Sequence, residues 1–157
     1  MGQQHQYSLQ TEWTGNSGSG TKDYKSYERS VTLSGEGKPN IYSSADPAFR
    51  GDTSCWNPEE LLVASLSICH MLSYLHLCAV AGIVVTAYRD DVKGAMSLES
   101  GVGRMTFVTL NPHVTITDAS KSDLAKELHE KAHKQCFIAN SVNFPVESNP
   151  TIDTTGA

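Results

Sequence analysis

The sequence predicts an α+β fold in which helices lie on one side of antiparallel sheet. A long apolar stretch at 57–82 opens with strong helix-start signals. Runs of β-branched and aromatic residues lie both before and after that stretch, and an amphipathic segment follows at about 118–134. The resulting order of strands, buried helix, strands, amphipathic helix and strand is typical of this class.

The N-terminal part is expected to form a hairpin and a short third strand. Residues 6–13 and 27–33 have strand character, and the Gly/Ser-rich segment 15–22 supplies the turn between them. Residues 41–42 add a short strand. The segment 43–56 is rich in turn residues and leads into the first helix.

The start of the first helix is marked by several signals. Asn57 is a favourable N-cap, Pro58 suits the first helical position, and Glu59 and Glu60 place negative charge in the first turn. Glu60 stands at the third position, where it can close a capping box. The helix is therefore expected to begin at residue 58.

The body of this helix has no formally charged residue from Leu61 to Ala81 and is apolar on all sides, which indicates burial in protein or in lipid. Its length would just span a bilayer, but His70, His76 and three serines interrupt it and no basic cluster flanks it. We expect a core helix. One stripe contains Leu62, Leu66, Cys69, Leu72 and His76.

Two strands, 83–92 and 103–117, are expected to follow as an antiparallel pair with a turn at 94–103. Asp118 or Ser120 can cap a second helix that runs to about Lys134 and ends near Cys136. Its apolar face is expected to contain Leu124, Leu128 and Ala132. Residues 141–146 form a last strand, and the polar tail 150–157 is expected to be frayed.

Size and charge narrow the classes of function. A chain of 157 residues has the size of one domain, 1–157, or of one subunit whose core a partner completes. Twelve basic and seventeen acidic residues, with no Lys/Arg patch, argue against binding to nucleic acid or a membrane surface. No signal segment is visible, so we expect a cytoplasmic protein whose four cysteines form no structural disulfides.

Cys69, in the middle of the first helix, is the central candidate for chemistry. An unpaired buried cysteine is usually inert, and burial raises a thiol pKa, so reactivity requires a nearby cation. The sequence has four arginines. Arg50, in the loop before the helix, is the first choice for this role, and Arg29, in the N-terminal hairpin, is the second.

Cys136 is the best partner thiol for Cys69. Cys78 lies nine residues along the same helix, on the opposite face and about 13 Å away along the axis, and Cys55 precedes the helix. Cys136 ends a different helix and can in principle approach to the Cα separation of roughly 5.5–6 Å that a disulfide favours. Cys55 and Cys78 are expected to be structural or incidental thiols.

A metal site is the less favoured alternative, and no metal is expected. Cys69 and His70 are adjacent and point about 100° apart on a helix, and His133 with Cys136 completes no recognised zinc pattern. His70, His76 and His133 are therefore expected to be core or interface histidines. The sequence has no G-x-S-x-G motif, so a serine hydrolase is not supported.

Glu59 can serve as a helix cap or as the carboxylate that orients Arg50. On a straight helix Glu59 lies about 15 Å from Cys69. If both residues serve one site, two chains must share that site.

The segments NPEELLVASLSICHMLSYL and AHKQCFIANSVNFPV resemble the OsmC/Ohr family (osmotically inducible protein C and organic hydroperoxide resistance), the OsmC-like peroxiredoxins. The resemblance covers the chain from the N-terminal hairpin to about Val146. It implies an intertwined homodimer, with antiparallel sheets around long central helices and shared active sites at the interface.

The resemblance also implies a mechanism without metal or organic cofactor. Cys69 matches the peroxidatic cysteine, whose thiolate reduces a hydroperoxide to an alcohol and becomes a sulfenic acid. Cys136 matches the resolving cysteine, and an external dithiol, of lipoyl type or another thiol, would open the resulting disulfide. Glu59 matches the glutamate that holds the activating arginine; Arg50 fits the OsmC-like branch, and Arg29 is closer to the other arrangement.

Two features depart from the family pattern. The sequence reads Cys-Phe at 136–137, where many members have Cys-Pro, and Cys55 and Cys78 are additional. We expect a thiol peroxidase that acts on organic hydroperoxides in oxidative stress. The alternative is a non-catalytic protein on the same scaffold that senses redox state or binds a small hydrophobic molecule.

Overall fold

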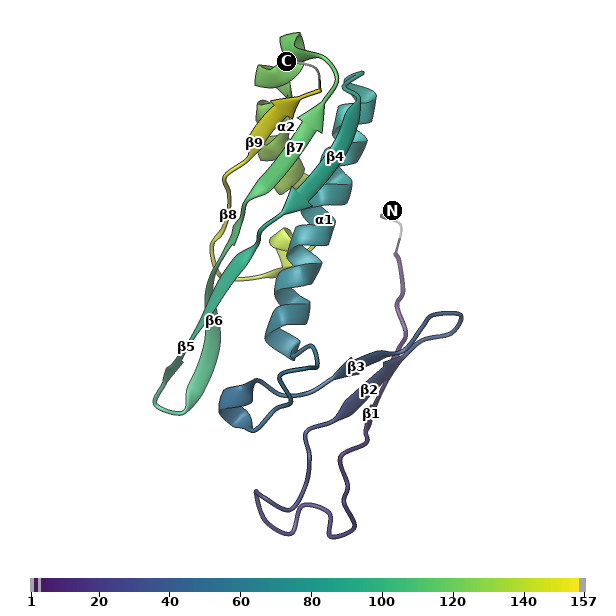
Figure 1. Ribbon diagram of the computed structural model, residues 1–157, viewed down its shortest axis with the longest axis vertical. Helices are drawn as coiled ribbons and strands as arrows, with labels where there is room; N and C mark the ends of the chain where they lie inside the picture. Colours follow the sequence, from purple (N-terminus) through teal and green to yellow (C-terminus); the bar gives the residue numbers. More distant parts are fainter. Residues whose placement is uncertain (1, 3, 156–157) are drawn as a thin grey trace. The chain divides into compact units, whose positions relative to one another are not determined.

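The computed structural model describes residues 2 and 4–155 and has mixed α+β structure, as predicted (Figure 1). The chain divides into two units, the first ending at Leu61 and the second beginning at Leu62. The prediction of one domain over 1–157 stays a prediction.

The first unit contains a three-stranded antiparallel sheet in the order β1–β2–β3, formed by Gln10–Trp13, Val31–Ser34 and Ile41–Ser43. The predicted hairpin and third strand are confirmed, but the first two strands are shorter than expected. The connection between them is folded by polar contacts, among them the Trp13 Nε1 bond to the Glu28 carbonyl at 2.8 Å. A Cβ on Gly15 would lie 1.9 Å from the Glu28 carbonyl oxygen, so only glycine fits there.

The loop before the first helix contains a short 3-10 helix, η1, at Pro47–Phe49. Asp46 caps it by accepting a hydrogen bond from the Ala48 amide at 2.7 Å. Arg50 ends it in the left-handed conformation with φ 66°. The backbone here is therefore sharply turned, and the Arg50 side chain is exposed.

Helix α1 spans Pro58–Val80, and local signals fix both of its ends. The capping box is confirmed: Asn57 Oδ1 accepts from the Glu60 amide at 2.8 Å, and the Asn57 amide donates to Glu60 Oε2 at 3.1 Å. At the other end Gly82 adopts φ 68°, and the Ile83 amide donates to the Cys78 carbonyl at 2.8 Å. This is a Schellman termination, which glycine accommodates without strain.

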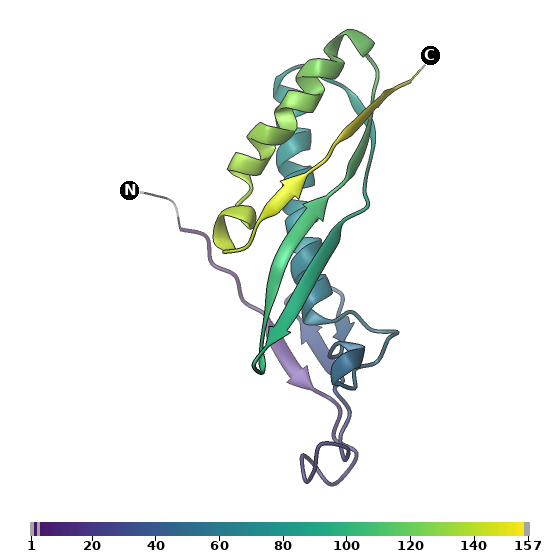
Figure 2. The ribbon, with the colours of Figure 1, turned by 90° about the vertical axis from the view of Figure 1, so that its left-hand side faces the viewer.

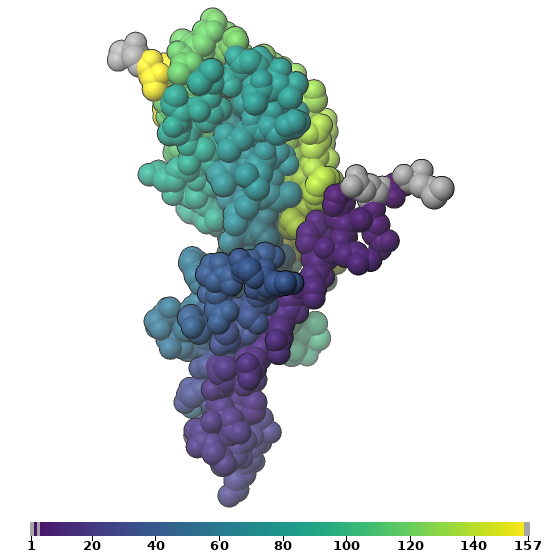
Figure 3. Space-filling view, turned by 90° about the vertical axis from the view of Figure 1, so that its right-hand side faces the viewer, coloured from purple at the N-terminus to yellow at the C-terminus, as the bar shows by residue number. Residues whose placement is uncertain are grey.

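Helix α1 was expected to be a core helix that is apolar on all sides, but it is buried mainly on one side. The buried residues are Leu66, His70, Tyr74, Leu77 and Cys78. Leu72 is 59% exposed, and Ile68 is 51% exposed. Figure 3 views the side of the second unit on which α1 is uncovered. Because the helix is apolar on all sides, its own periodicity cannot say which side packs inward.

The same helix is also long and apolar enough to cross a membrane, by length and composition alone. A core helix of a soluble protein passes the same test. Its Leu66–His70–Tyr74 side packs into protein here, so membrane insertion gains no separate support.

Four strands follow α1, where two were predicted. They are β4 at Val85–Asp90, β5 at Lys93–Glu99, β6 at Val102–Leu110 and β7 at Pro112–Ile116. Strand β4 pairs antiparallel with β7, and β5 pairs antiparallel with β6. The turn expected at 94–103 is only Ser100–Gly101, where both residues have positive φ, as a two-residue hairpin turn requires.

The long hairpin changes sheet at Asp90, Asp91 and Asn111. Asp90 Oδ1 accepts from the Asn111 amide at 2.7 Å, and Asn111 Nδ2 donates to the Asp91 carbonyl at 2.9 Å. These bonds replace ladder hydrogen bonds where each strand is interrupted. The interruption explains why one apparent strand became two.

Helix α2 spans Ser122–Gln135 and follows a 3-10 turn, η2, at Ala119–Lys121 that Asp118 caps. The helix ends at Cys136, as predicted. Its buried residues are Ala125, Leu128, His129 and Ala132, whereas Leu124, expected on the buried face, is 41% exposed. Helices α1 and α2 lie on the same side of the β4–β7–β9 sheet (Figure 2).

The C-terminal segment corrects two expectations. Residues 139–141 form a 3-10 turn, η3, and the last strands are β8 at Val146–Ser148 and β9 at Thr151–Thr154, so a strand at 141–146 is wrong. Strand β8 pairs parallel with β6 and β9 parallel with β7, so the sheets are mixed and not wholly antiparallel.

The polar tail is not frayed through Thr154, because its backbone completes a ladder with β7 and Ile152 packs against the core. Residues 156–157 lie outside the described residues. The core of the second unit therefore has two clusters, one around Tyr74, Val114 and Ala132, and the other around Leu66, Val108 and Leu110.

Candidate functional site

The structure brings Cys69 and Cys136 together in the second unit. Cys69 is half-buried in α1, and Cys136 is fully buried where α2 ends. Cys69 lies close enough to Cys136 to raise the pKa of its thiol, and the Ala139 amide donates to Cys136 Sγ at 3.4 Å. Both are free thiols. This is the pair that the helical geometry favoured in the sequence.

The two thiols differ in environment. Burial raises the pKa of Cys136, and the neighbouring Cys69 thiol raises that pKa further. Cys136 is therefore a protonated thiol at neutral pH. Such a thiol is a poor nucleophile until it loses its proton.

The other two cysteines lie elsewhere. Cys78 is 1% exposed, and burial raises its pKa, although the neighbouring Tyr74 opposes that shift. Cys55 lies in the loop of the first unit and is half-buried.

Glu59 occupies the first turn of α1, and its Oε2 atom is buried with no hydrogen-bond partner in the described part of the chain. Within residues 2 and 4–155 the ion pairs are those of Asp91 with Arg89 and His113. Glu59 therefore pairs with neither Arg50 nor Arg29 inside one chain. A buried carboxylate oxygen without a partner is costly, so this oxygen is a strong acceptor for a group from outside the chain.

Arg29 is held firmly within the first unit. Its guanidinium donates to the carbonyls of Tyr27 and Tyr24 at 2.5 and 2.6 Å, and lies 4.1 and 4.3 Å from the centroids of their rings. It lines a cavity of about 510 Å³ whose wall includes Trp13, Tyr27, Val31, Leu33, Pro58 and Leu61. Arg50, in contrast, is exposed. Arg29 is thus a preorganised cation at an apolar cavity.

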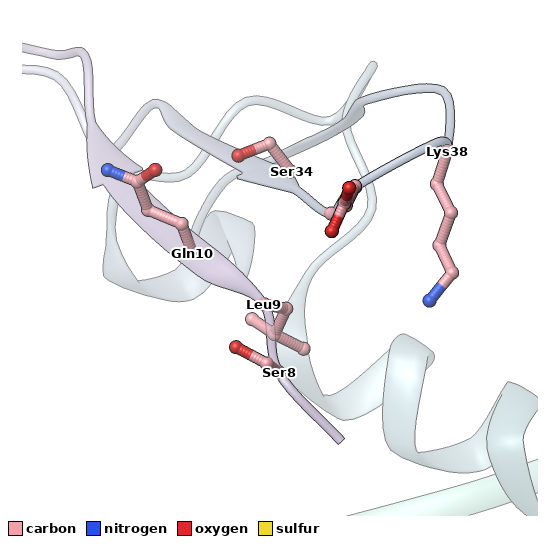
Figure 4. Close-up of a pocket in the computed structure, with 7 residues that line it drawn as sticks. Ser8, Leu9, Gln10, Ser34 and Lys38 are labelled. Atoms are coloured by element: carbon pink, nitrogen blue, oxygen red, sulfur yellow. The ribbon is translucent and has the colours of Figure 1, made fainter. Parts of the chain in front are cut away.

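A second cavity on the first unit has about the same size, 520 Å³, but a different lining. Ser8, Leu9, Gln10, Ser34 and Lys38 surround it (Figure 4). These side chains come from the β1 and β2 region, and no cysteine, histidine or arginine lines it. It offers no group suited to thiol chemistry.

Two buried histidines, His70 and His129, form a pair, and His70 follows Cys69 directly in the sequence. His70 Nε2 is 3.0 Å from His129 Nδ1, and burial lowers their pKa values to about 4 and about 3. His70 is a core histidine, as expected, but His129 was not singled out in the sequence. Its signal was the spacing of seven residues before Cys136, nearly two helical turns.

The remaining histidines offer no metal centre. His76 is exposed and His133 is half-buried. Among the residues that the structure describes, no group of three or more His, Cys, Asp or Glu side chains could hold a metal ion.

Comparison with known proteins identifies the family. The model of the OsmC-like protein family matches residues 51–150. The chain belongs to the OsmC-like family. An OsmC-like protein of unknown function from Vibrio cholerae shares 30% identity with a TM-score of 0.85, covering 94% of this chain and all of that one. No match was found among curated proteins.

Two more distant OsmC-like structures show the same fold. An organic hydroperoxide resistance protein from Elizabethkingia anophelis, with thiocyanate bound, has 18% identity and a TM-score of 0.66, covering 98% of this chain and 100% of that one. One from Legionella pneumophila has 17% identity and a TM-score of 0.64, with coverage of 96% and 99%. Family membership therefore suggests a redox or peroxide-related function.

The departure from the OsmC-like pattern after Cys136 has a structural counterpart. Phe137 stands where many members have proline, and its side chain is 80% exposed. The chain turns there through extended backbone at Cys136 and then η3, without the fixed φ of proline. Cys136 is held by the bond from Ala139 instead.

Proposed function

We propose that this OsmC-like protein is a cytoplasmic thiol peroxidase that reduces organic hydroperoxides to alcohols. The observation that carries the proposal is the pair of neighbouring thiols, Cys69 and Cys136, of which Cys136 is buried and protonated. A half-buried thiol beside a buried, protonated one is arranged for attack by the first and closure by the second.

In the first step the Cys69 thiolate attacks one oxygen of ROOH. An S–O bond forms, the O–O bond breaks, and the alkoxide leaves and takes a proton from solvent to become ROH. Cys69 is now a sulfenic acid, oxidised by two electrons. Cys136 does not compete for the peroxide because it is buried and protonated.

In the second step Cys136 attacks the Cys69 sulfur. The S–S bond forms, the S–O bond breaks, and the hydroxide leaves as water with the proton that Cys136 releases. An external dithiol then reduces the disulfide and is itself oxidised to a disulfide. Neither step requires a metal or an organic cofactor.

An arginine and Glu59 complete the proposed site from a second subunit. Glu59 lies about 15 Å along α1 from Cys69, too far for one chain to bring both to one sulfur. The exposed apolar side of α1, with Ile68 and Leu72, and the unpartnered Glu59 oxygen support a homodimer. Of the two arginines, Arg29 has the stronger support because it is held in place, and Arg50 is the alternative.

The apolar cavity that Arg29 lines supports an alkyl or aryl hydroperoxide over hydrogen peroxide. Trp13, Leu33 and Leu61 offer apolar surface for an R group, which hydrogen peroxide lacks. The guanidinium would stabilise the thiolate and the developing alkoxide charge.

The experiment is a peroxidase assay with excess dithiol across tert-butyl hydroperoxide, cumene hydroperoxide and hydrogen peroxide. Wild type should consume the organic peroxides faster, and Cys69→Ser should consume them no faster than a protein-free control. Cys55→Ser, which alters a thiol away from the pair, should match wild type. Wild-type protein without turnover on any substrate refutes the proposal.

The cavity at Arg29 also favours a second candidate, a redox-sensing or ligand-binding protein without turnover. A preorganised cation in an apolar cavity is suited to a small hydrophobic acid. Binding of such a molecule, lost in Arg29→Ala, together with absent peroxide turnover would favour this candidate.

A further inference from the structure

A pair of buried histidines joins α1 to α2. His70 and His129 are 1% and 2% exposed, and their rings lie nearly parallel, at 12° to each other. Tyr74 stacks on His129 with centroids 3.8 Å apart. One hydrogen bond joins the pair, between His70 Nε2 and His129 Nδ1 at 3.0 Å, and it runs between the two helices.

Burying this pair costs free energy that apolar side chains would not. One nitrogen of each ring takes part in the hydrogen bond between the rings. The other two nitrogens, His70 Nδ1 and His129 Nε2, have no protein partner among the described residues. Unpaired buried polar atoms destabilise a fold, and two apolar residues of similar volume would avoid that penalty. The pair adds a directional contact between α1 and α2, because a hydrogen bond fixes the relative placement of its two partners and apolar contacts leave it free.

The two histidines and the two cysteines share the same pair of helices, so the histidine hydrogen bond affects how the cysteines are placed. On α2, His129 and Cys136 are seven residues apart, nearly two turns, so they lie on one side and roughly 10 Å apart along the axis. On α1, Cys69 and His70 are adjacent. The helices thus meet at the imidazole pair and near the thiol pair, in addition to the stacking of Tyr74 on His129, and the imidazole bond restricts the sliding and the rotation of α2 on α1.

We propose that His70 and His129 are a positioning pair whose hydrogen bond sets the register of α2 on α1 and so the rate at which Cys136 closes on Cys69. Neither imidazole touches the reacting sulfurs. The inference deepens the proposed function and rests on it for its purpose. The closure itself can be measured without any peroxide.

The surroundings keep both rings neutral. Burial is the main cause of the lowered pKa values, and His133 on α2 lowers that of His70 further, whereas Asp90 on β4 raises it. The other titratable neighbours are Tyr74 on α1 and Tyr88 on β4, whose rings lie 3.8 and 6.4 Å from that of His129. At neutral pH the bond therefore joins two uncharged rings.

The test follows closure with 5,5′-dithiobis(2-nitrobenzoate) on the full chain carrying Cys55→Ser. The Cys69 thiolate attacks the reagent and forms a mixed disulfide, which releases one thionitrobenzoate. Cys136 then loses its proton to solvent and attacks the Cys69 sulfur, which releases a second thionitrobenzoate. The second release is first order and reports closure, and Cys78, at 1% exposed, reacts slowly.

The informative variants place a side-chain amide either where the hydrogen-bonding ring nitrogen lies or one bond away from that position. His129→Asn puts an amide where Nδ1 lies, whereas His129→Gln displaces it, and at position 70 the roles reverse because Nε2 makes the bond. We expect His129→Gln and His70→Asn to slow the second phase about tenfold or more, with the first phase within about twofold of wild type. His129→Asn and His70→Gln should close at nearly the wild-type rate.

The outcomes separate positioning from mere stability. Asn and Gln variants at one site with matched thermal unfolding temperatures but different closure rates support the pair. Equal closure in all four variants overturns it, and so does wild type that forms no Cys69–Cys136 disulfide. Wild type that closes normally yet consumes no hydroperoxide refutes the peroxidase and leaves the positioning pair intact.

Discussion

The buried thiol of Cys136 lies beside the half-buried thiol of Cys69, close enough for Cys69 to raise its pKa. The two come from different helices and are separated by most of the second unit in sequence. Because the two thiols are neighbours, a disulfide between them is the expected product of oxidation.

After one equivalent of organic hydroperoxide, peptide mapping should find Cys69 joined to Cys136. In Cys136→Ser the sulfenic acid has no resolving thiol, so dimedone should label Cys69 and the disulfide should be absent. A bridge from Cys69 to Cys78 would contradict the helical geometry.

Mixing two inactive variants should restore activity if the site is shared between subunits. In a heterodimer of Cys69→Ser and Arg29→Ala, one site receives Cys69 from one chain and Arg29 from the other. Random exchange of equal amounts should recover about a quarter of wild-type activity, since half the dimers carry one intact site of two.

The matched control replaces Arg29→Ala with Arg50→Ala in the same mixture. An Arg50→Ala protein that is already active by itself assigns the role to Arg29. If neither mixture recovers activity after subunit exchange, the arginine acts within its own chain.

Leu72→Asp should disrupt the dimer, because it places a charge on the exposed apolar side of α1, where the side chain is 59% exposed. Sedimentation of wild type should show a dimer and that of Leu72→Asp a monomer. Val84→Asp, at 58% exposed but outside α1, is the matched control. An active wild-type monomer would remove the shared-site argument.

Acid should destabilise the fold through its two buried histidines. His70 and His129 have pKa values lowered from 6.5 to about 4 and about 3, so between these values and 6.5 the unfolded chain binds protons that the folded one does not. The free energy of unfolding is thus unaffected by them above pH 6.5. It should fall below that pH by at most about 1.4 kcal/mol per pH unit for each histidine.

Urea unfolding between pH 4 and pH 8 measures this dependence. The double variant His70→Leu/His129→Leu should show a much flatter profile from pH 6.5 to pH 4, whatever its absolute stability. Hydrogen bonds from Ser54 and Ser120 lower the pKa values of Asp52 and Asp118 from 3.8. These two carboxyl groups therefore contribute only at still lower pH. An equally steep profile in the double variant would assign the acid sensitivity to other groups.

The sequence by itself determined the features that depend on neighbouring residues. The ends of α1 follow from the Asn57–Glu60 box and from Gly82, both of which act within a few residues. The α+β class, the end of α2 at Cys136 and the choice of Cys136 over Cys78 also followed from local patterns and helical spacing.

Only the tertiary structure decided which side of each element faces the core. The apolar body of α1 has no polar side to mark solvent, so the burial of His70 in place of Leu72 depends on where the sheet and α2 lie. Strands β8 and β9 exist because β6 and β7 offer them distant backbone partners, which a polar local sequence does not reveal. The His70–His129 bond joins residues 59 positions apart, and such a contact is fixed by packing and not by local pattern.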